Sequence, residues 1–120
     1  MSDIIYLLSK VPPPIVVLIG NVRLVADRDS TTLTCTSESS NPRAELTWTR
    51  NGSGVTVTTT PVYLPGSNNG FRTEQTLTLR PMPADDGTRY ACSASNDVQG
   101  SSKQSNLLTL DLFCKYAIYT

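Results

Sequence analysis

Two cysteines of this chain, Cys35 and Cys92, lie in short stretches where apolar and polar residues alternate. In residues 31–36 and 89–94 the cysteine shares one side with apolar residues, and the other side is mostly polar. A period of two is typical of a β-strand with one buried and one solvated face. Stacked sheets lie about 10 Å apart, which lets two cysteines on facing sheets join through the core. The pattern predicts an all-β sandwich of two antiparallel sheets with an inter-sheet Cys35–Cys92 disulfide bond.

The rest of the sequence favours the same fold class. A length of 120 residues suits one domain, and apolar residues make up 38% of the chain while charged residues make up 17%. No stretch keeps apolar residues at helical spacing over three turns, so we expect little helix. Alternation and turn residues predict strands at 15–18, 31–36, 45–50, 55–60, 76–79, 89–94 and 108–112. The sheet to which residues 55–70 belong stays open.

Composition excludes several classes of function. Ten basic residues offset ten acidic ones, so no field attracts nucleic acid. The chain has no histidine, which removes the usual general base and metal ligand. A serine–lysine pair would remain, but the lysines, Lys10, Lys103 and Lys115, lie near the ends or in a turn. We expect no enzyme activity, no catalytic residue, no cofactor and no small-molecule substrate.

The remaining cysteine and the acidic pairs invite other hypotheses. Cys114 could form an intermolecular disulfide, but we favour a free thiol in a terminal segment. Asp27 with Asp29, and Asp85 with Asp86, could ligate calcium, which binds oxygen ligands, or act as paired acid/base carboxylates. We interpret both pairs as solvated turn residues, because no further acidic residues follow at loop spacing. We therefore expect no metal site.

Three further residues complete a signature. Trp48 follows Cys35 by thirteen positions, one strand and one turn onward, so its ring can cover the disulfide. Tyr90 lies two residues before Cys92, where its hydroxyl can reach back to upstream backbone. Together with Asp86, these residues resemble the Cys…Trp…Asp-x-x-x-Tyr-x-Cys signature of the immunoglobulin fold. The resemblance covers about residues 11–113.

Departures from the family pattern narrow the resemblance. Thr88 stands where the family prefers glycine or alanine, with Gly87 displaced by one position, so the corner before Tyr90 is expected to differ slightly. Residues 105–110 lack the Gly-x-Gly bulge of antigen-receptor variable domains. The 57-residue separation between the cysteines is also short for a variable domain. The domain is therefore more similar to the constant-like or intermediate sets.

The flanks imply a place within a longer protein. Residues 1–10 resemble the end of a preceding immunoglobulin domain, which leads into the semi-rigid linker Pro12–Pro14, and residues 114–120 resemble an exit or linker. The first apolar run is interrupted too early to span a membrane and does not resemble a secretory leader. The chain resembles an internal, second-position domain of a nectin, nephrin or Kirre-type adhesion receptor. This implies an extracellular location, with any membrane anchor outside these residues.

The sequence also suggests where such a domain binds. Asn51-Gly52-Ser53 is an N-glycosylation sequon on an expected exposed turn, although Asn-Gly is also a common bare hairpin turn. Outward strand positions form a candidate protein-binding face: Glu45, Thr47, Thr49, Arg89, Ser93 and Thr109, together with Ala91, Leu107 and Asp111. Tyr63, Leu64 and Phe71 are alternative anchors, or they cap the core. The leading hypothesis is a homophilic or heterophilic binding module, and the alternative is a spacer with no ligand.

Overall fold

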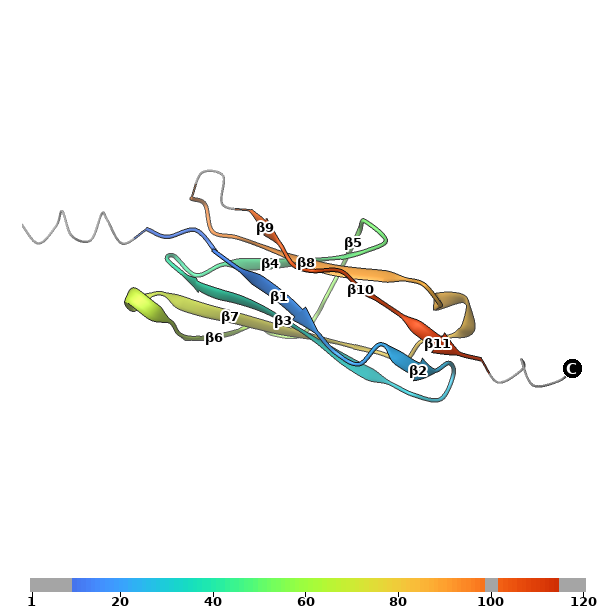
Figure 1. Cartoon of the computed structure of the whole chain (residues 1–120). Coiled ribbons are helices and arrows are strands. Elements are labelled where there is room, and N and C mark those ends of the chain that lie inside the picture. Colours follow the sequence, from blue (N-terminus) through green and yellow to red (C-terminus); the bar gives the residue numbers. More distant parts are fainter. Residues whose placement is uncertain (1–9, 99–101, 115–120) are drawn as a thin grey trace, which may run out of the picture.

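The computed structural model describes residues 10–98 and 102–114, and their strands form two main facing sheets (Figure 1). The β3 sheet has the order β1 (Val16–Ile19), β3 (Thr31–Ser40), β7 (Phe71–Leu79), β6 (Val62–Pro65). The β8 sheet has the order β10 (Leu108–Thr109), β8 (Arg89–Ser95), β4 (Glu45–Arg50), β5 (Ser53–Val55), and β9 (Lys103–Gln104) also pairs with β8. Both are antiparallel, which confirms the predicted fold class. The expectations for residues 1–9 and 115–120 lie outside the described residues.

A third, two-stranded sheet closes one end of the sandwich. In it β2 (Arg23–Val25) pairs in parallel with β11 (Asp111–Phe113). Short 3-10 turns occupy Ser67–Asn69 and Pro83–Asp85. The second of these turns precedes the corner before β8, where Gly87 adopts a φ of 81° and the Leu112 N–H donates to the Asp86 carboxylate at 2.9 Å. The corner thus ties the start of β8 to the last strand.

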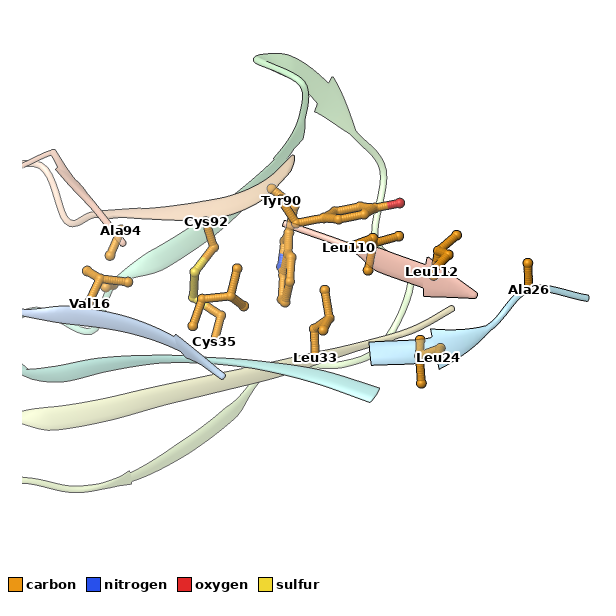
Figure 2. Packing of buried hydrophobic residues seen from close by; sticks show 13 residues of the cluster. Val16, Leu24, Ala26, Leu33, Cys35, Tyr90, Cys92, Ala94, Leu110 and Leu112 are labelled. Carbon is orange, nitrogen blue, oxygen red and sulfur yellow. A yellow bond between two sulfur atoms is a disulfide. The ribbon is translucent and has the colours of Figure 1, made fainter. Parts of the chain in front are cut away.

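The predicted disulfide lies in the middle of the core. Cys35 of β3 and Cys92 of β8 are bonded across the sheets with their Cα atoms 6.4 Å apart, and both are fully buried. Figure 2 shows Leu33, Tyr90 and Leu110 on one side of this bond and Val16 and Ala94 on the other. Alternation in the strands that carry these residues points them inward from both sheets. The bond therefore connects the two layers at their buried faces.

Trp48 is the largest fully buried side chain, with 2% of its surface exposed. It lies opposite Cys92 in the β4–β8 register. Its indole Nε1–H donates to Gln75 Oε1 at 2.8 Å, and Gln75 Nε2 donates to the Thr59 carbonyl oxygen at 2.8 Å. A buried indole needs such a partner, because an unpaired polar group in a core is costly. Gln75 thus anchors both the indole and the segment after β5.

The strand expected at 55–60 is wrong in its bounds. β5 ends at Val55, and the chain then crosses the edge of the sandwich to reach β6 in the opposite sheet. The crossing is held at Thr59, whose hydroxyl donates to the Thr76 carbonyl of β7. Pairing with β7 therefore determines the sheet membership that the sequence left open.

The single last strand expected at 108–112 is also interrupted. Leu108 and Thr109 pair with β8, whereas residues 111–113 leave that sheet and pair with β2. Leu110 and Leu112 are buried as expected, and Leu108 is half-buried. The alternation of buried and exposed side chains continues across the change of partner from β8 to β2, because the chain stays extended along the edge of the sandwich.

Asn106, just before this strand, closes the outer edge of β1. The Leu18 N–H donates to Asn106 Oδ1 at 2.9 Å, and Asn106 Nδ2 donates to the Leu18 carbonyl at 2.9 Å. The side-chain amide therefore occupies the two backbone groups with which another strand would pair. Such blocked edges limit edge-to-edge association.

We expect Asn106→Ala to lower the free energy of unfolding by about 1–3 kcal/mol, because it leaves a backbone donor and acceptor of Leu18 without these partners. Hydrogen exchange should quicken most at the Leu18 amide. Asn106→Asp can accept a hydrogen bond but not donate one, so its free energy of unfolding should lie between those of the unaltered chain and Asn106→Ala. Unchanged exchange at Leu18 in the alanine variant would show that the edge is held by other contacts.

Candidate functional site

The residues predicted to form a binding face lie on one surface of the β8 sheet. Thr47 lies opposite Ser93, and Thr109 lies opposite Arg89, so these side chains share a face. All six candidates are exposed or half-buried: Glu45, Thr47, Thr49, Arg89, Ser93 and Thr109. Ala91 is a correction, since only 1% of it is exposed. Its short side chain lies opposite Thr49, below the level that longer neighbours reach.

The face is hollowed near one end, at a site that we call the Arg89 hollow. It has a volume of about 520 Å³ and brings together residues of four segments: Thr49, Asn51, Gly52, Gly87, Arg89, Gln104 and Leu107. Two of the six candidate residues, Thr49 and Arg89, line it. The other four lie elsewhere on the face.

Two glycines keep the Arg89 hollow open. Gly52 and Gly87 both have positive φ, at 83° and 81°, and a Cβ atom added at either would meet no atom within 4 Å. Any other residue would be strained there and would also project a side chain into the open space. The backbone turns themselves therefore form part of the surface of the hollow.

Asn51 joins the β4–β5 turn to β8. Its backbone N–H donates to the Arg89 carbonyl at 2.8 Å, and the Arg89 N–H donates to Asn51 Oδ1 at 2.9 Å. Asn51 and Gly52 both have positive φ, as the Asn-Gly pair predicted for a tight hairpin. This pair of hydrogen bonds fixes the turn beside Arg89 and makes Asn51 a part of the hollow.

Leu107 supplies the apolar part of the hollow. With 55% of its surface exposed, it is among the most exposed large apolar residues described. Sequence reasoning placed Leu107 on this face but did not recognise it, Asn51 or Gln104 as neighbours of Arg89. Only the registers of β8 with β4, β9 and β10 bring them together, and no local motif carries that information.

Arg89 supplies the charge. The ion pairs between side chains in residues 10–98 and 102–114 involve Arg23, Arg28, Arg50 and Arg72, and none involves Arg89. The Arg89 guanidinium is thus available to a carboxylate from outside the molecule. Arginine is enriched at the energetically important positions of protein interfaces, whereas leucine is under-represented there, so Arg89 is the residue of the hollow best suited to such a position.

Tyr90 points to the other side of β8, into the core. Burial raises the pKa of its phenol, while the positive charge of Arg50 opposes this shift. Arg50 also pairs with Asp85 at 2.7 Å, and Asp85 accepts a hydrogen bond from the Met82 N–H at 2.9 Å. The Arg50 side chain therefore lies near the Tyr90 phenol at the corner.

The other candidates lie apart from the hollow. Tyr63 and Phe71 are about one-third exposed on the β6 and β7 strands, whereas Leu64 is half-buried. The Arg43 guanidinium stacks on the Tyr63 ring, 4.2 Å from the ring centroid.

Asp29 accepts a hydrogen bond from the Val25 N–H at 2.8 Å, which lowers the pKa of the Asp29 carboxyl. No group of three histidine, cysteine, aspartate or glutamate side chains gathers in the described part of the chain. Cys114 is a half-buried free thiol that packs against the core.

A protein-family model for immunoglobulin domains matches residues 12–96. The chain belongs to the immunoglobulin domain family. The match includes Cys35, Trp48, Asp86, Tyr90 and Cys92, the residues that carried the resemblance. A search of curated protein sequences gives no significant match.

Solved structures with the same fold include parts of a nectin-like molecule, of Rst and of an IgNAR antibody. The immunoglobulin domain aligns with the ectodomain of mouse nectin-like molecule 4 (TM-score 0.70, 24% identity, 86% of this chain and 35% of that one). It aligns with Rst D1-D2 with a TM-score of 0.72 and 21% identity, over 85% of this chain and 50% of that one. It aligns with the C1 domain of an IgNAR antibody with a TM-score of 0.64 and 20% identity, over 82% of this chain and 94% of that one. These likenesses establish the fold. The chain spans about a third of the first of these structures and half of the second.

Within the described residues, no helix of the immunoglobulin domain has the length and apolar character that a membrane span requires.

Proposed function

We propose that this immunoglobulin domain is an extracellular module of a cell-surface recognition receptor and binds a protein partner through the outer face of the β8 sheet. The adhesion proteins among the structural neighbours support the class of receptor. The inter-sheet disulfide supports an extracellular location, because such bonds persist in oxidising compartments. Complementarity of surfaces, and not catalysis, is the mechanism.

The observation that carries this proposal is the Arg89 hollow. An arginine that forms no ion pair with another described residue lies there beside a largely exposed leucine. The matching partner surface presents a carboxylate next to an apolar side chain that fills the hollow around Leu107. Five other candidate residues of the face, together with Gln104 of the hollow, are small or polar and would form the rim: Glu45, Thr47, Thr49, Ser93, Thr109 and Gln104.

Capture on an array of purified cell-surface ectodomains tests the proposal. We expect Leu107→Glu to raise the dissociation constant for a captured ectodomain at least about tenfold, because it places a second acid where the partner presents one. Thr78→Glu is the matched control, since Thr78 is an exposed residue on the opposite sheet. Sedimentation velocity at micromolar concentration asks whether a second copy is the partner. Equal capture by both variants would contradict the proposed face, and no capture by the unaltered chain made without N-glycosylation would contradict binding.

A spacer function is the second candidate, and it is favoured by the way both ends are held. Val11 forms a reciprocal backbone bridge with Asn41, and Asn96 Nδ2 donates to the carbonyls of Val11 and Pro42 at 2.8 and 2.9 Å. At the other end, β11 pairs with β2. The described chain thus enters and leaves at opposite ends of the sandwich (Figure 1). A strict monomer that captures no ectodomain would support this function.

A further inference from the structure

We infer that Asn51 carries an N-linked glycan whose first sugars lie in the Arg89 hollow, and that this glycan controls access to the proposed binding face. The control of access rests on the proposed binding face and the occupancy rests on the proposed extracellular location, whereas the position of the glycan rests on the geometry of the hollow. The sequon is Asn51-Gly52-Ser53, and all three residues are exposed. An N-x-S sequon on an exposed turn is accessible to glycosylation in a secreted protein.

The hydrogen bonds of Asn51 identify the atom that can carry the sugar. The Arg89 backbone N–H is a donor, so the side-chain atom that faces it must be the acceptor Oδ1. This contact assigns the two ends of the amide and leaves Nδ2 as the end turned away from the Arg89 N–H. Glycosylation modifies Nδ2 and leaves Oδ1 an acceptor, so the turn keeps its bond to β8 when the sugar is attached.

The modification requires a lipid-linked diphosphate oligosaccharide as donor. A bond forms between Asn51 Nδ2 and C1 of the first N-acetylglucosamine, and the bond between C1 and the diphosphate oxygen breaks. The lipid diphosphate leaves with the electron pair of the broken bond, and Nδ2 loses one proton to the surrounding base. The amide nitrogen retains one hydrogen, and no oxidation or reduction occurs.

The hollow offers space and suitable chemistry for the attached sugars. Asn51 itself lines it, and its volume of about 520 Å³ lies in the range of sites that hold small molecules. The added glycan meets no side chain at Gly52 or Gly87, whose Cβ positions are open. Arg89 and Gln104 provide hydrogen-bond donors for sugar hydroxyls, and Leu107 provides an apolar surface for the acetamido methyl group.

A glycan in this position would cover the residues proposed to contact a partner. The glycosylated domain would then present a closed face and act as a spacer, whereas the unmodified domain would present Arg89 and Leu107. Modification of one asparagine thus selects between the two functions proposed above.

Secretion of the full chain from a cultured eukaryotic cell line tests occupancy. Peptide mass spectrometry should find a glycan on Asn51 in the unaltered chain and in Ser53→Thr, which retains the sequon. The glycan should be lost in Ser53→Ala, which keeps Asn51 and its bond to Arg89. A secreted, folded chain with unmodified Asn51 would overturn the inference and would leave the proposed binding face untouched.

Thiol labelling tests the position of the glycan. Leu107→Cys in a Cys114→Ala background should react with a maleimide severalfold more slowly in the Ser53→Thr chain than in the Ser53→Ala chain. Thr78→Cys on the opposite sheet is the control and should react equally in both. An occupied Asn51 with equal labelling at residue 107 would overturn the placement in the hollow.

Ectodomain capture then separates the two proposals. Capture by Ser53→Ala and severalfold weaker capture by the glycosylated chain would support control of access. Equal capture by both would overturn that control while supporting the binding function. Capture by neither would contradict the binding function, and the occupancy and labelling results would still decide the rest.

Discussion

Trp48→Ala is expected to lower the free energy of unfolding by about 3–5 kcal/mol, the cost of removing a large buried aromatic side chain. The indole lies opposite Cys92 and packs in the core, so its loss leaves a cavity between the sheets. It also leaves Gln75 Oε1 without its 2.8 Å partner. Urea unfolding followed by circular dichroism measures the change in free energy.

Two control variants make this result specific. Thr49→Ala, one residue along the same strand, should change stability little because Thr49 points to the outer face. Trp48→Phe keeps an aromatic ring but loses the hydrogen bond to Gln75, so its loss of stability should lie between those of Thr49→Ala and Trp48→Ala. Similar small effects for Trp48→Ala and Thr49→Ala would show that the assignment of inner and outer faces is wrong.

Removal of the disulfide is the second large effect that we expect. In the chain-entropy model, a bond that closes a 57-residue separation stabilises a fold by about 4 kcal/mol. The double variant Cys35→Ala/Cys92→Ala should therefore lose about that free energy of unfolding. The comparison is made by denaturant unfolding of both proteins under the same oxidising conditions.

Cys114→Ala is the matched control for the disulfide variant, since it removes a cysteine that forms no disulfide in the described structure. We expect a smaller effect, because the Cys114 side chain is only half-buried. A loss of stability in Cys114→Ala as large as in the double variant would mean that the inter-sheet bond is not the main covalent restraint on the fold.

The features that could be predicted from the sequence are local ones. A period of two around Cys35 and Cys92 identified the buried faces of two strands, and Asn51-Gly52 identified a tight hairpin. The structure confirms the resulting sandwich and its disulfide bond. These predictions succeed because periodicity and positive φ depend on neighbours in the chain.

The features that could not be predicted depend on distant pairing. β6 joins the β3 sheet through its register with β7, and Asn106 reaches Leu18 across 88 positions of sequence. The Arg89 hollow combines the β4–β5 turn with residues that follow β8. Its residues could be placed on one face, but their meeting around Arg89 required the strand registers. Outward positions are mostly polar, so their sequence carries little information about which of them meet.

Peptide mapping of non-reduced protein, made under oxidising conditions, tests the central claim that an inter-sheet disulfide joins the two layers of this immunoglobulin domain. After thiols are blocked and the chain is digested, the peptides that contain Cys35 and Cys92 should be recovered as one linked species, with Cys114 blocked as a free thiol. Recovery of Cys35 and Cys92 as separate, blocked peptides would contradict both the architecture and the receptor function proposed from it.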